Sequence, residues 1–202
     1  KIAAHGRGWH SQTAKTSRVN PMTSPEFTDP QAIARNAADA IRSRLSLTSV
    51  DMGLVLGSGW SAGVDRLGTT LGRIPLSELP GFFAPVVAGH GGDLVAVALP
   101  SGKTAVVLTG RTHFYEGRGV ESVVHGVRTV AALGATTMIL TNGCGGLDPS
   151  WGPGTIVAIR DHINLTGATP LRGATFIDMS TAWTPRLLEV TERVAPGTPT
   201  GV

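Results

Sequence analysis

The segment 111–117, Arg-Thr-His-Phe-Tyr-Glu-Gly, groups four reactive side chains directly after an apolar run. Arg111 is a permanent cation whose planar guanidinium can donate to two oxygens of one anion. His113 adds an imidazole, and Tyr115 and Glu116 add a phenol and a carboxylate. A cation, an imidazole and a phenol in so short a segment predict a site that holds an anion beside a sugar.

Two further segments join an apolar run to a glycine-rich turn. They read Leu-Val-Leu-Gly-Ser-Gly at 54–59 and Ile-Leu-Thr-Asn-Gly-Cys-Gly-Gly at 139–146. Such turns expose backbone N–H groups, and Ser58 adds a hydroxyl. Donors that are already oriented avoid the cost of reorganising solvent around a multiply charged anion. Each turn alone is a weak signal, since a single Gly-Ser-Gly is usually only a turn and this spacing is not that of a dinucleotide fingerprint.

Taken in order, the motifs resemble those of the trimeric-type purine nucleoside phosphorylases. The resemblance rests on Leu-Gly-Ser-Gly-Trp at 56–60, Gly-Arg-Thr-His-Phe-Tyr-Glu-Gly at 110–117, Thr-Asn-Gly-Cys-Gly-Gly-Leu at 141–147 and Arg-Asp-His-Ile-Asn-Leu at 160–165. It covers residues 53 to about 186. Trp60 and the compact loop 165–170 look more like the bacterial branch of the family.

The resemblance implies an α/β fold, in which a mixed central β-sheet is flanked by helices in three layers, as in the nucleoside phosphorylases and hydrolases. It also implies reversible phosphorolysis of purine ribo- and deoxyribonucleosides to free base and (deoxy)ribose 1-phosphate, a reaction of purine salvage. The substrates are a purine nucleoside and inorganic phosphate, with no cofactor and no metal. The expected assembly is a cytoplasmic homotrimer.

The resemblance assigns phosphate binding to four groups. These are the side chains of Ser58, Arg111 and His113 and the backbone N–H of Gly143. Taken alone, Arg111 would more often be a surface ion-pair partner and His113 a structural histidine. Their co-occurrence with the two glycine turns favours the phosphate site.

The residues expected to act on the sugar and in catalysis are His113, Tyr115 and Glu116, with Tyr115 packing on the ribose. His90, within Gly-His-Gly-Gly at 89–92, is assigned to a lid near the site. The plainer interpretations are that Glu116 neutralises a nearby arginine and that His90 is only a loop residue. Cys144 is expected to be a small packed residue without a nucleophilic role.

The chain departs from the family pattern at its end. Val202 precedes the segment that supplies the family's Asn and Glu contacts to the purine, so the chain is expected to lack the C-terminal third and to be weakly active or inactive by itself. Two alternatives remain: a methylthioadenosine phosphorylase, and a non-catalytic truncated phosphate-binding homologue. Ser58 and Asn142 favour the nucleoside phosphorylase over the first alternative.

Composition suits one compact domain, at 41% hydrophobic and 15% charged residues over 202 positions. Residues 1–21 are basic and are expected to be a disordered leader or a cloning remnant, with a single α/β domain over 22–202, incomplete at the C-terminus. Without the leader the 17 Lys and Arg residues fall to 13, against 14 Asp and Glu residues, which argues against a nucleic-acid surface. The apolar runs are too short for membrane helices, and the six histidines show no metal-ligand spacing.

The periodicity of apolar residues predicts the elements that position these motifs. Helices are expected from Pro30, capped by Asp29, and at 120–134 and 185–194, with strands at 52–56, 93–99, 103–109, 137–140 and 155–159. In the second helix, apolar positions from 120 to 134 predict a buried stripe, with Glu121, His125 and Arg128 facing outward. The alternation of helices and strands places functional loops at strand ends.

Overall fold

The computed structural model describes residues 28–57, 59–83 and 92–202. The predicted leader, 1–21, lies outside the described residues. Among the described residues, no helix is long and apolar enough to cross a membrane.

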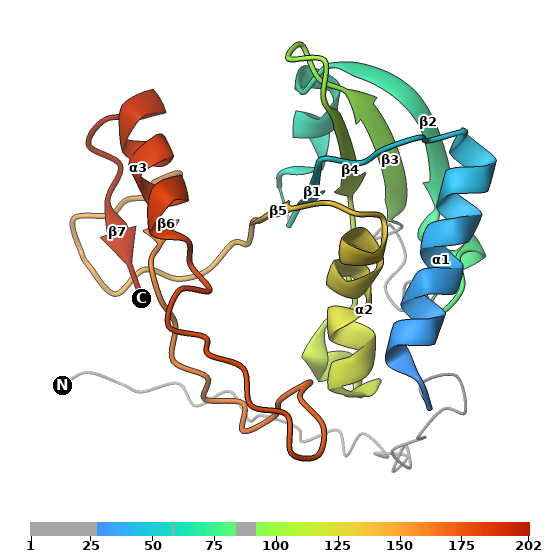
Figure 1. The fold of residues 1–202 in the computed structure, drawn as a ribbon. Helices are drawn as coiled ribbons and strands as arrows, with labels where there is room; N and C mark the ends of the chain where they lie inside the picture. The colour runs from blue at the N-terminus through green and yellow to red at the C-terminus, as the bar shows by residue number, and fades with distance from the viewer. Residues whose placement is uncertain (1–27, 58, 84–91) are drawn as a thin grey trace, which may run out of the picture.

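A five-stranded mixed sheet organises the protein (Figure 1). The strands lie in the order β2-β3-β4-β1-β5, and β1 pairs in parallel with β4 and β5, whereas β2, β3 and β4 are antiparallel neighbours. Their bounds are β1 Met52–Val55, β2 Thr69–Pro75, β3 Asp93–Ala98, β4 Thr104–Leu108 and β5 Thr137–Leu140. Val55, at the end of β1, is in register with Leu108 on one side and Leu140 on the other. The carboxyl ends of three parallel strands therefore lie level at one edge of the sheet.

Two helices cover one face of the sheet and pack against each other (Figure 1). Helix α1 (Pro30–Leu45) begins at Asp29, whose carboxylate accepts the backbone N–H groups of Gln31 and Ala32, as predicted. Helix α2 (Gly119–Ala132) lies beside it. The core under both helices includes Ala38, Ile41, Val55, Ile74, Leu94, Val106, Leu108, Val130 and Leu133.

The opposite face of the sheet is covered by a short 3₁₀ helix, η2 (Ser61–Arg66). Val64 of η2 packs in a second core with Leu54, Leu56, Val95, Val97, Ala105 and Val107. Successive strand residues alternate between the two cores, as the pleat requires. The prediction of a mixed central sheet flanked by helices is thus confirmed.

The predicted outward face of α2 was wrong. His125 is 1% exposed, and the side chains of Glu121 and Arg128 are 15% and 17% exposed, whereas Val127 is 38% exposed. Packing against α1 and the 79–83 segment selects a face that carries Ser122, His125 and Thr129. Glu121 stays charged within this packing. Burial raises its pKa, but hydrogen bonds from Arg128 and Arg172 and their positive charges hold the pKa below its ordinary value.

The chain beyond β5 forms a separate group of elements (Figure 1). Strand β6 (Ala158–Ile159) pairs in parallel with β7 (Thr200–Gly201), and α3 (Pro185–Val194) matches the predicted helix. The strand predicted at 155–159 is correct only for its last two residues. Several apolar side chains of this region are exposed, among them Leu147, Leu165 and Phe176.

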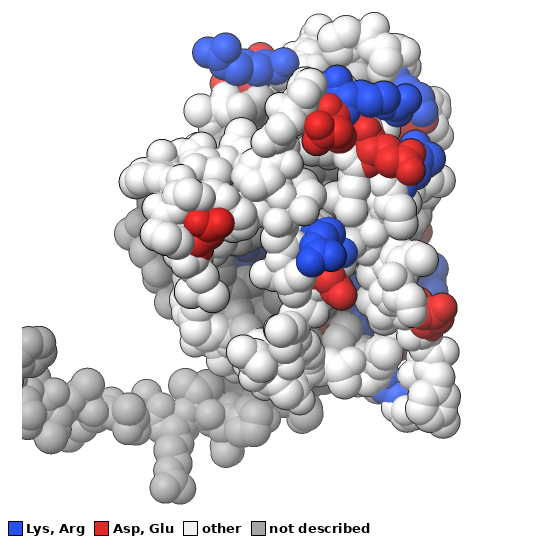
Figure 2. Space-filling model, turned by 90° about the vertical axis from the view of Figure 1, so that its left-hand side faces the viewer, with Lys and Arg blue, Asp and Glu red and all other residues white. Residues whose placement is uncertain are grey.

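Charged side chains occur in mixed groups on the face shown in Figure 2, with basic and acidic residues side by side. Among the ion pairs of the described residues, Arg73 pairs with both Asp65 and Asp93, and Lys103 lies 4.0 Å from Asp51. This distribution differs from the continuous basic surface that nucleic-acid binding requires.

Candidate functional site

Three chain segments meet where β1, β4 and β5 end. Gly57 follows β1, Arg111 follows β4 and Thr141 follows β5. The hydroxyl of Thr141 accepts the backbone N–H of Gly57 at 2.8 Å and donates to the carbonyl of Val55 at 3.1 Å. Thr141 therefore fixes the turn after β1 to the end of β5.

Replacing Thr141 with valine is expected to lower the free energy of unfolding by about 1–3 kcal/mol. Valine keeps the shape but leaves the part-buried N–H of Gly57 without its acceptor. Thr141→Ser, which retains the hydroxyl, is the matched control and should lose markedly less. Urea unfolding of both variants measures the difference. Equal losses of free energy would show that the Thr141 hydroxyl does not stabilise the junction.

The guanidinium of Arg111 lies across the same junction. Its Nη1 donates to the carbonyl of Thr141 at 3.2 Å, and a Cβ built on Gly57 would lie 2.7 Å from Nη1. Within the described part of the chain, Nη1 is the only guanidinium nitrogen of Arg111 with a hydrogen bond. The other N–H groups of this guanidinium remain able to donate to an anion.

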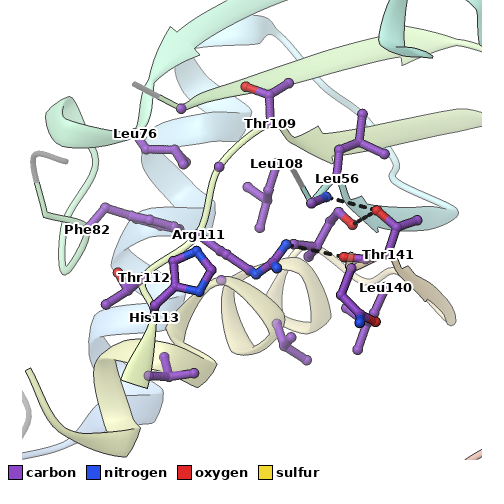
Figure 3. A pocket seen from close by; sticks show the side chains of 18 of the residues that line it. Leu56, Leu76, Phe82, Leu108, Thr109, Arg111, Thr112, His113, Leu140 and Thr141 are labelled. Carbon is purple, nitrogen blue, oxygen red and sulfur yellow. Dashed lines mark hydrogen bonds between the residues drawn. The ribbon is translucent and has the colours of Figure 1, made fainter. Parts of the chain in front are cut away.

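The three segments border a cavity of about 1020 Å³ (Figure 3). Arg111 extends toward Thr141 and Leu140, and the His113 ring lies beside Arg111, as Figure 3 shows. The rest of the lining is largely apolar, and its larger members are Phe82, Phe83, Val123, Val127, Leu140, Ile159 and Trp183. A charged donor at one end and an extended apolar wall suit a ligand with an anionic part and an uncharged planar part.

Tyr115 and Glu116 lie in a 3₁₀ turn, η4 (Phe114–Glu116), and His113 is its N-cap residue. The carboxylate of Glu116 accepts the backbone N–H of His113 at 2.7 Å and lies 3.5 Å from Nε of Arg118. The rings of His113 and Tyr115 stack with 4.9 Å between centroids, and Tyr115 is 78% exposed. Glu116 thus orders the backbone that carries the His113 and Tyr115 side chains. It also pairs with Arg118, which agrees with the interpretation that Glu116 neutralises a nearby arginine.

Only some of the residues predicted for the site line the cavity. Arg111, His113, Tyr115 and Glu116 all line the cavity. Ser58 and His90 lie outside the described residues, although Gly57 and Gly59 on either side of Ser58 line the cavity. Gly143 is exposed and is not part of the lining, whereas Asn142 is. What each of these residues does remains a prediction.

Cys144 is exposed, so the expectation of a packed residue was wrong. The carboxylate of Asp161 accepts the backbone N–H of His162 at 2.8 Å, and Trp183 Nε1–H donates to the His162 ring at 3.1 Å. Asp161 therefore orders the local backbone, and the hydrogen bond to the imidazole comes from Trp183. Among the described residues, no three His, Cys, Asp or Glu side chains are placed to hold a metal ion.

Sequence reasoning missed three residues at or behind the cavity. Thr141 stands in the Thr-Asn-Gly motif, so its position could have drawn attention to its hydroxyl. Phe82 lines the cavity from a segment without helix or strand periodicity. His125, behind Phe82, was expected to face solvent.

The buried His125 is expected to make stability depend on pH. Burial lowers its pKa from the ordinary value of 6.5, the hydrogen bond to the carbonyl of Pro80 opposes this, and the charge of Arg128 lowers it further. The unfolded chain therefore takes up a proton at this residue before the folded protein does. The contribution of His125 to the free energy of unfolding is fully present above about pH 6.5. It falls as the pH drops toward the lowered pKa, by up to about 1.4 kcal/mol per pH unit.

Urea unfolding at pH 7.5, 6.5 and 5.5 measures this effect. The His125→Gln variant has no titrating group at this position and should lose less stability than the parent between pH 6.5 and 5.5. The other histidines are common to both proteins, so their contributions cancel. Parallel losses in the two proteins would contradict the prediction.

The fold and the site define a class of protein. Residues 51–199 match the family model of the Phosphorylase superfamily, and the chain belongs to that superfamily.

Several individual members of the superfamily are similar to this chain. The chain is 48% identical to a purine nucleoside phosphorylase of Cellulomonas sp over 194 residues, which are 94% of this chain and 69% of that protein. Purine nucleoside phosphorylase isoform 2 of Schistosoma mansoni, solved with cytosine and ribose-1-phosphate, superposes with a TM-score of 0.73 at 29% identity, covering 85% of this chain and 65% of that one. A purine nucleoside phosphorylase of the same organism, solved with inosine, gives a TM-score of 0.70 at 30% identity, covering 84% and 63%. Within its superfamily the chain thus groups with the purine nucleoside phosphorylases, and it spans about two thirds of their length.

Proposed function

We propose that the full-length protein catalyses the reversible phosphorolysis of purine nucleosides. The products are the free base and ribose or deoxyribose 1-phosphate. The observation that carries this proposal is the meeting of the β1, β4 and β5 ends, where the Arg111 guanidinium lies over Gly57 at the edge of a largely apolar cavity. Similarity to purine nucleoside phosphorylases, one of them solved with inosine, supports the choice of substrate.

In this reaction a phosphate oxygen forms a bond to the anomeric carbon of the sugar while the bond from that carbon to the purine nitrogen breaks. The electron pair of the broken bond goes to the base, which then gains a proton. The sugar carries oxocarbenium character in the transition state, so a phosphate dianion held beside it is both nucleophile and stabilising charge. Most of the catalysis then comes from positioning.

The donors we assign to phosphate are Arg111, His113, Ser58 and the N–H of Gly143. Arg111 contributes a guanidinium that Thr141 and Gly57 already orient, so little reorganisation is needed when phosphate binds. Tyr115, stacked on His113, would restrict the ribose, and Glu116 would act by holding the His113 backbone.

The wider setting is also part of the proposal. We assign the protein to purine salvage in the cytoplasm, with inorganic phosphate as co-substrate and no metal or organic cofactor. A homotrimer is the proposed assembly, and the exposed apolar side chains beyond β5 are consistent with further burial.

The test is a phosphorolysis assay on the full-length protein in the presence of EDTA. Inosine should yield hypoxanthine only when phosphate is added, and ³¹P NMR should show ribose 1-phosphate forming as phosphate is consumed. Cleavage without phosphate would indicate hydrolysis and overturn the proposal. Preference for methylthioadenosine would favour the sister phosphorylase, and phosphate binding without turnover would favour a non-catalytic homologue. The same assay on the 202-residue polypeptide tests the expectation that it is weakly active or inactive by itself.

A further inference from the structure

The segment from Pro80 to Phe83 is held between the two helices, on the side of the cavity away from β5. Nε2 of His125 in α2 lies 2.9 Å from the carbonyl oxygen of Pro80. The next residue, Gly81, has a φ of +75°, and a Cβ built there would lie 2.6 Å from Nε2 of His125 and 2.5 Å from Ile33 of α1. The turn is therefore fitted closely against both helices and requires glycine.

The two residues after this turn are aromatic, and both line the cavity. The Phe82 ring meets the His125 ring edge to face, with centroids 4.6 Å apart at 64°. The guanidinium carbon of Arg118 lies over the Phe83 ring, 4.5 Å from the ring centroid. Figure 3 shows Phe82 at the same cavity as Arg111 and His113.

We infer that His125 is a positioning residue for the nucleoside: by holding the Pro80 carbonyl and the Phe82 ring, it fixes the aromatic wall against which the uncharged part of the substrate packs. This inference rests on the proposed function. His125 is 1% exposed and does not line the cavity, so it acts through Phe82 and not on the substrate.

A histidine at position 125 can hydrogen-bond to the Pro80 carbonyl, which an apolar residue cannot do. Most of the core under α1 and α2 is apolar, and burying an imidazole there costs free energy unless it is hydrogen-bonded. The carbonyl it contacts stands two residues before Phe82, so the hydrogen bond fixes the direction in which the chain leaves the turn. The anion donors at the strand ends lie on other segments and do not depend on this contact.

The matched variants are His125→Gln and His125→Asn. Both replace the imidazole with a neutral amide, but only glutamine is long enough to place a donor near the position of Nε2. In the full-length protein we expect His125→Asn to raise KM for inosine about fivefold or more, and His125→Gln to raise it less than about twofold. KM for phosphate should stay within about twofold of the parent in both. Equal rises for inosine and phosphate, or equal effects of the two variants, would overturn the inference.

Phe82→Leu gives an independent readout if His125→Asn does not fold. Because His125 acts through this ring, its loss should raise KM for inosine and leave KM for phosphate within about twofold. An unchanged KM for inosine in Phe82→Leu would contradict the inference.

A measurement without substrate separates this inference from the proposed function. In protein labelled with fluorophenylalanine, the ¹⁹F resonance of Phe82 is assigned by its loss in Phe82→Leu. Both variants lose the imidazole ring beside Phe82, but only His125→Asn also loses the donor to Pro80, so it should shift or broaden this resonance more than His125→Gln does, and the Phe114 resonance should not move. If the unsubstituted protein showed no phosphorolysis activity, the proposed function would be wrong. The ¹⁹F measurement of how His125 positions Phe82 would still hold. An unchanged Phe82 resonance in folded His125→Asn would end the positioning role.

Discussion

Arg111→Lys is expected to lower kcat/KM for phosphate by about 10²–10³-fold. Lysine keeps the positive charge but loses the planar fork. It can direct an N–H group either to the carbonyl of Thr141 or to an anion, whereas arginine does the first through Nη1 and keeps other N–H groups for the second. Steady-state kinetics with varied phosphate, together with calorimetric binding of phosphate, measure the loss.

Arg66→Lys is the matched control, because Arg66 is an exposed residue at the end of η2 and does not line the cavity. It should leave kcat/KM within about twofold of the parent, since most surface substitutions away from a site have little effect. If Arg111→Lys behaved like Arg66→Lys, charge alone would account for the role of this position and the oriented fork would be unnecessary.

The placement of the candidate site at the ends of β1, β4 and β5 could be predicted from sequence, because the motifs that define it directly follow the strands. Each of three apolar runs is followed by a motif with glycine, and the runs match β1, β4 and β5. Once these strands are taken as parallel neighbours, their motifs must meet at one edge of the sheet. Arg111 and Thr141 do meet there, through the 3.2 Å hydrogen bond.

The side chains behind the cavity could not be predicted because their environment is set by distant parts of the chain. The apolar positions of α2 define a stripe, but contact with α1 and with the turn at Gly81 decides which face is buried. His125 is buried because the Pro80 carbonyl, 45 positions away in the chain, supplies a partner. No local pattern in α2 contains that information.

Strand β2 escaped prediction for a related reason. Its sequence, Thr-Thr-Leu-Gly-Arg-Ile-Pro, has a glycine in the middle and a proline at the end, both of which weaken a strand signal. It lies at the edge of the sheet and pairs with β3 through a register shift between Thr70 and Gly72. At Gly72 a Cβ would lie 2.7 Å from a methyl carbon of Leu45 in α1, so the glycine that obscures the pattern lets the Leu45 side chain pack close to the strand.

The close approach at Gly57 leads to the second large effect. A Cβ at this position would lie 2.7 Å from Nη1 of Arg111, 2.7 Å from the carbonyl oxygen of Thr141 and 3.0 Å from Cα of Asn142. Two of these neighbours are backbone atoms of the segment after β5 and cannot move without parting it from β1. We therefore expect Gly57→Ala to displace the guanidinium and the 141–142 segment together, and to lower kcat/KM by about 100-fold.

Gly63→Ala is the control for this change. Gly63 lies in η2, and a Cβ built there meets nothing within 4 Å among the described residues. The same methyl group added at this site should leave kcat/KM within about twofold of the parent. Circular dichroism and urea unfolding of both variants distinguish a displaced site from a lost fold. Gly57→Ala with the activity of Gly63→Ala would mean that the ends of β1 and β5 separate easily, and the junction of Gly57, Arg111 and Thr141 would then not be the fixed anion site on which the proposed reaction depends.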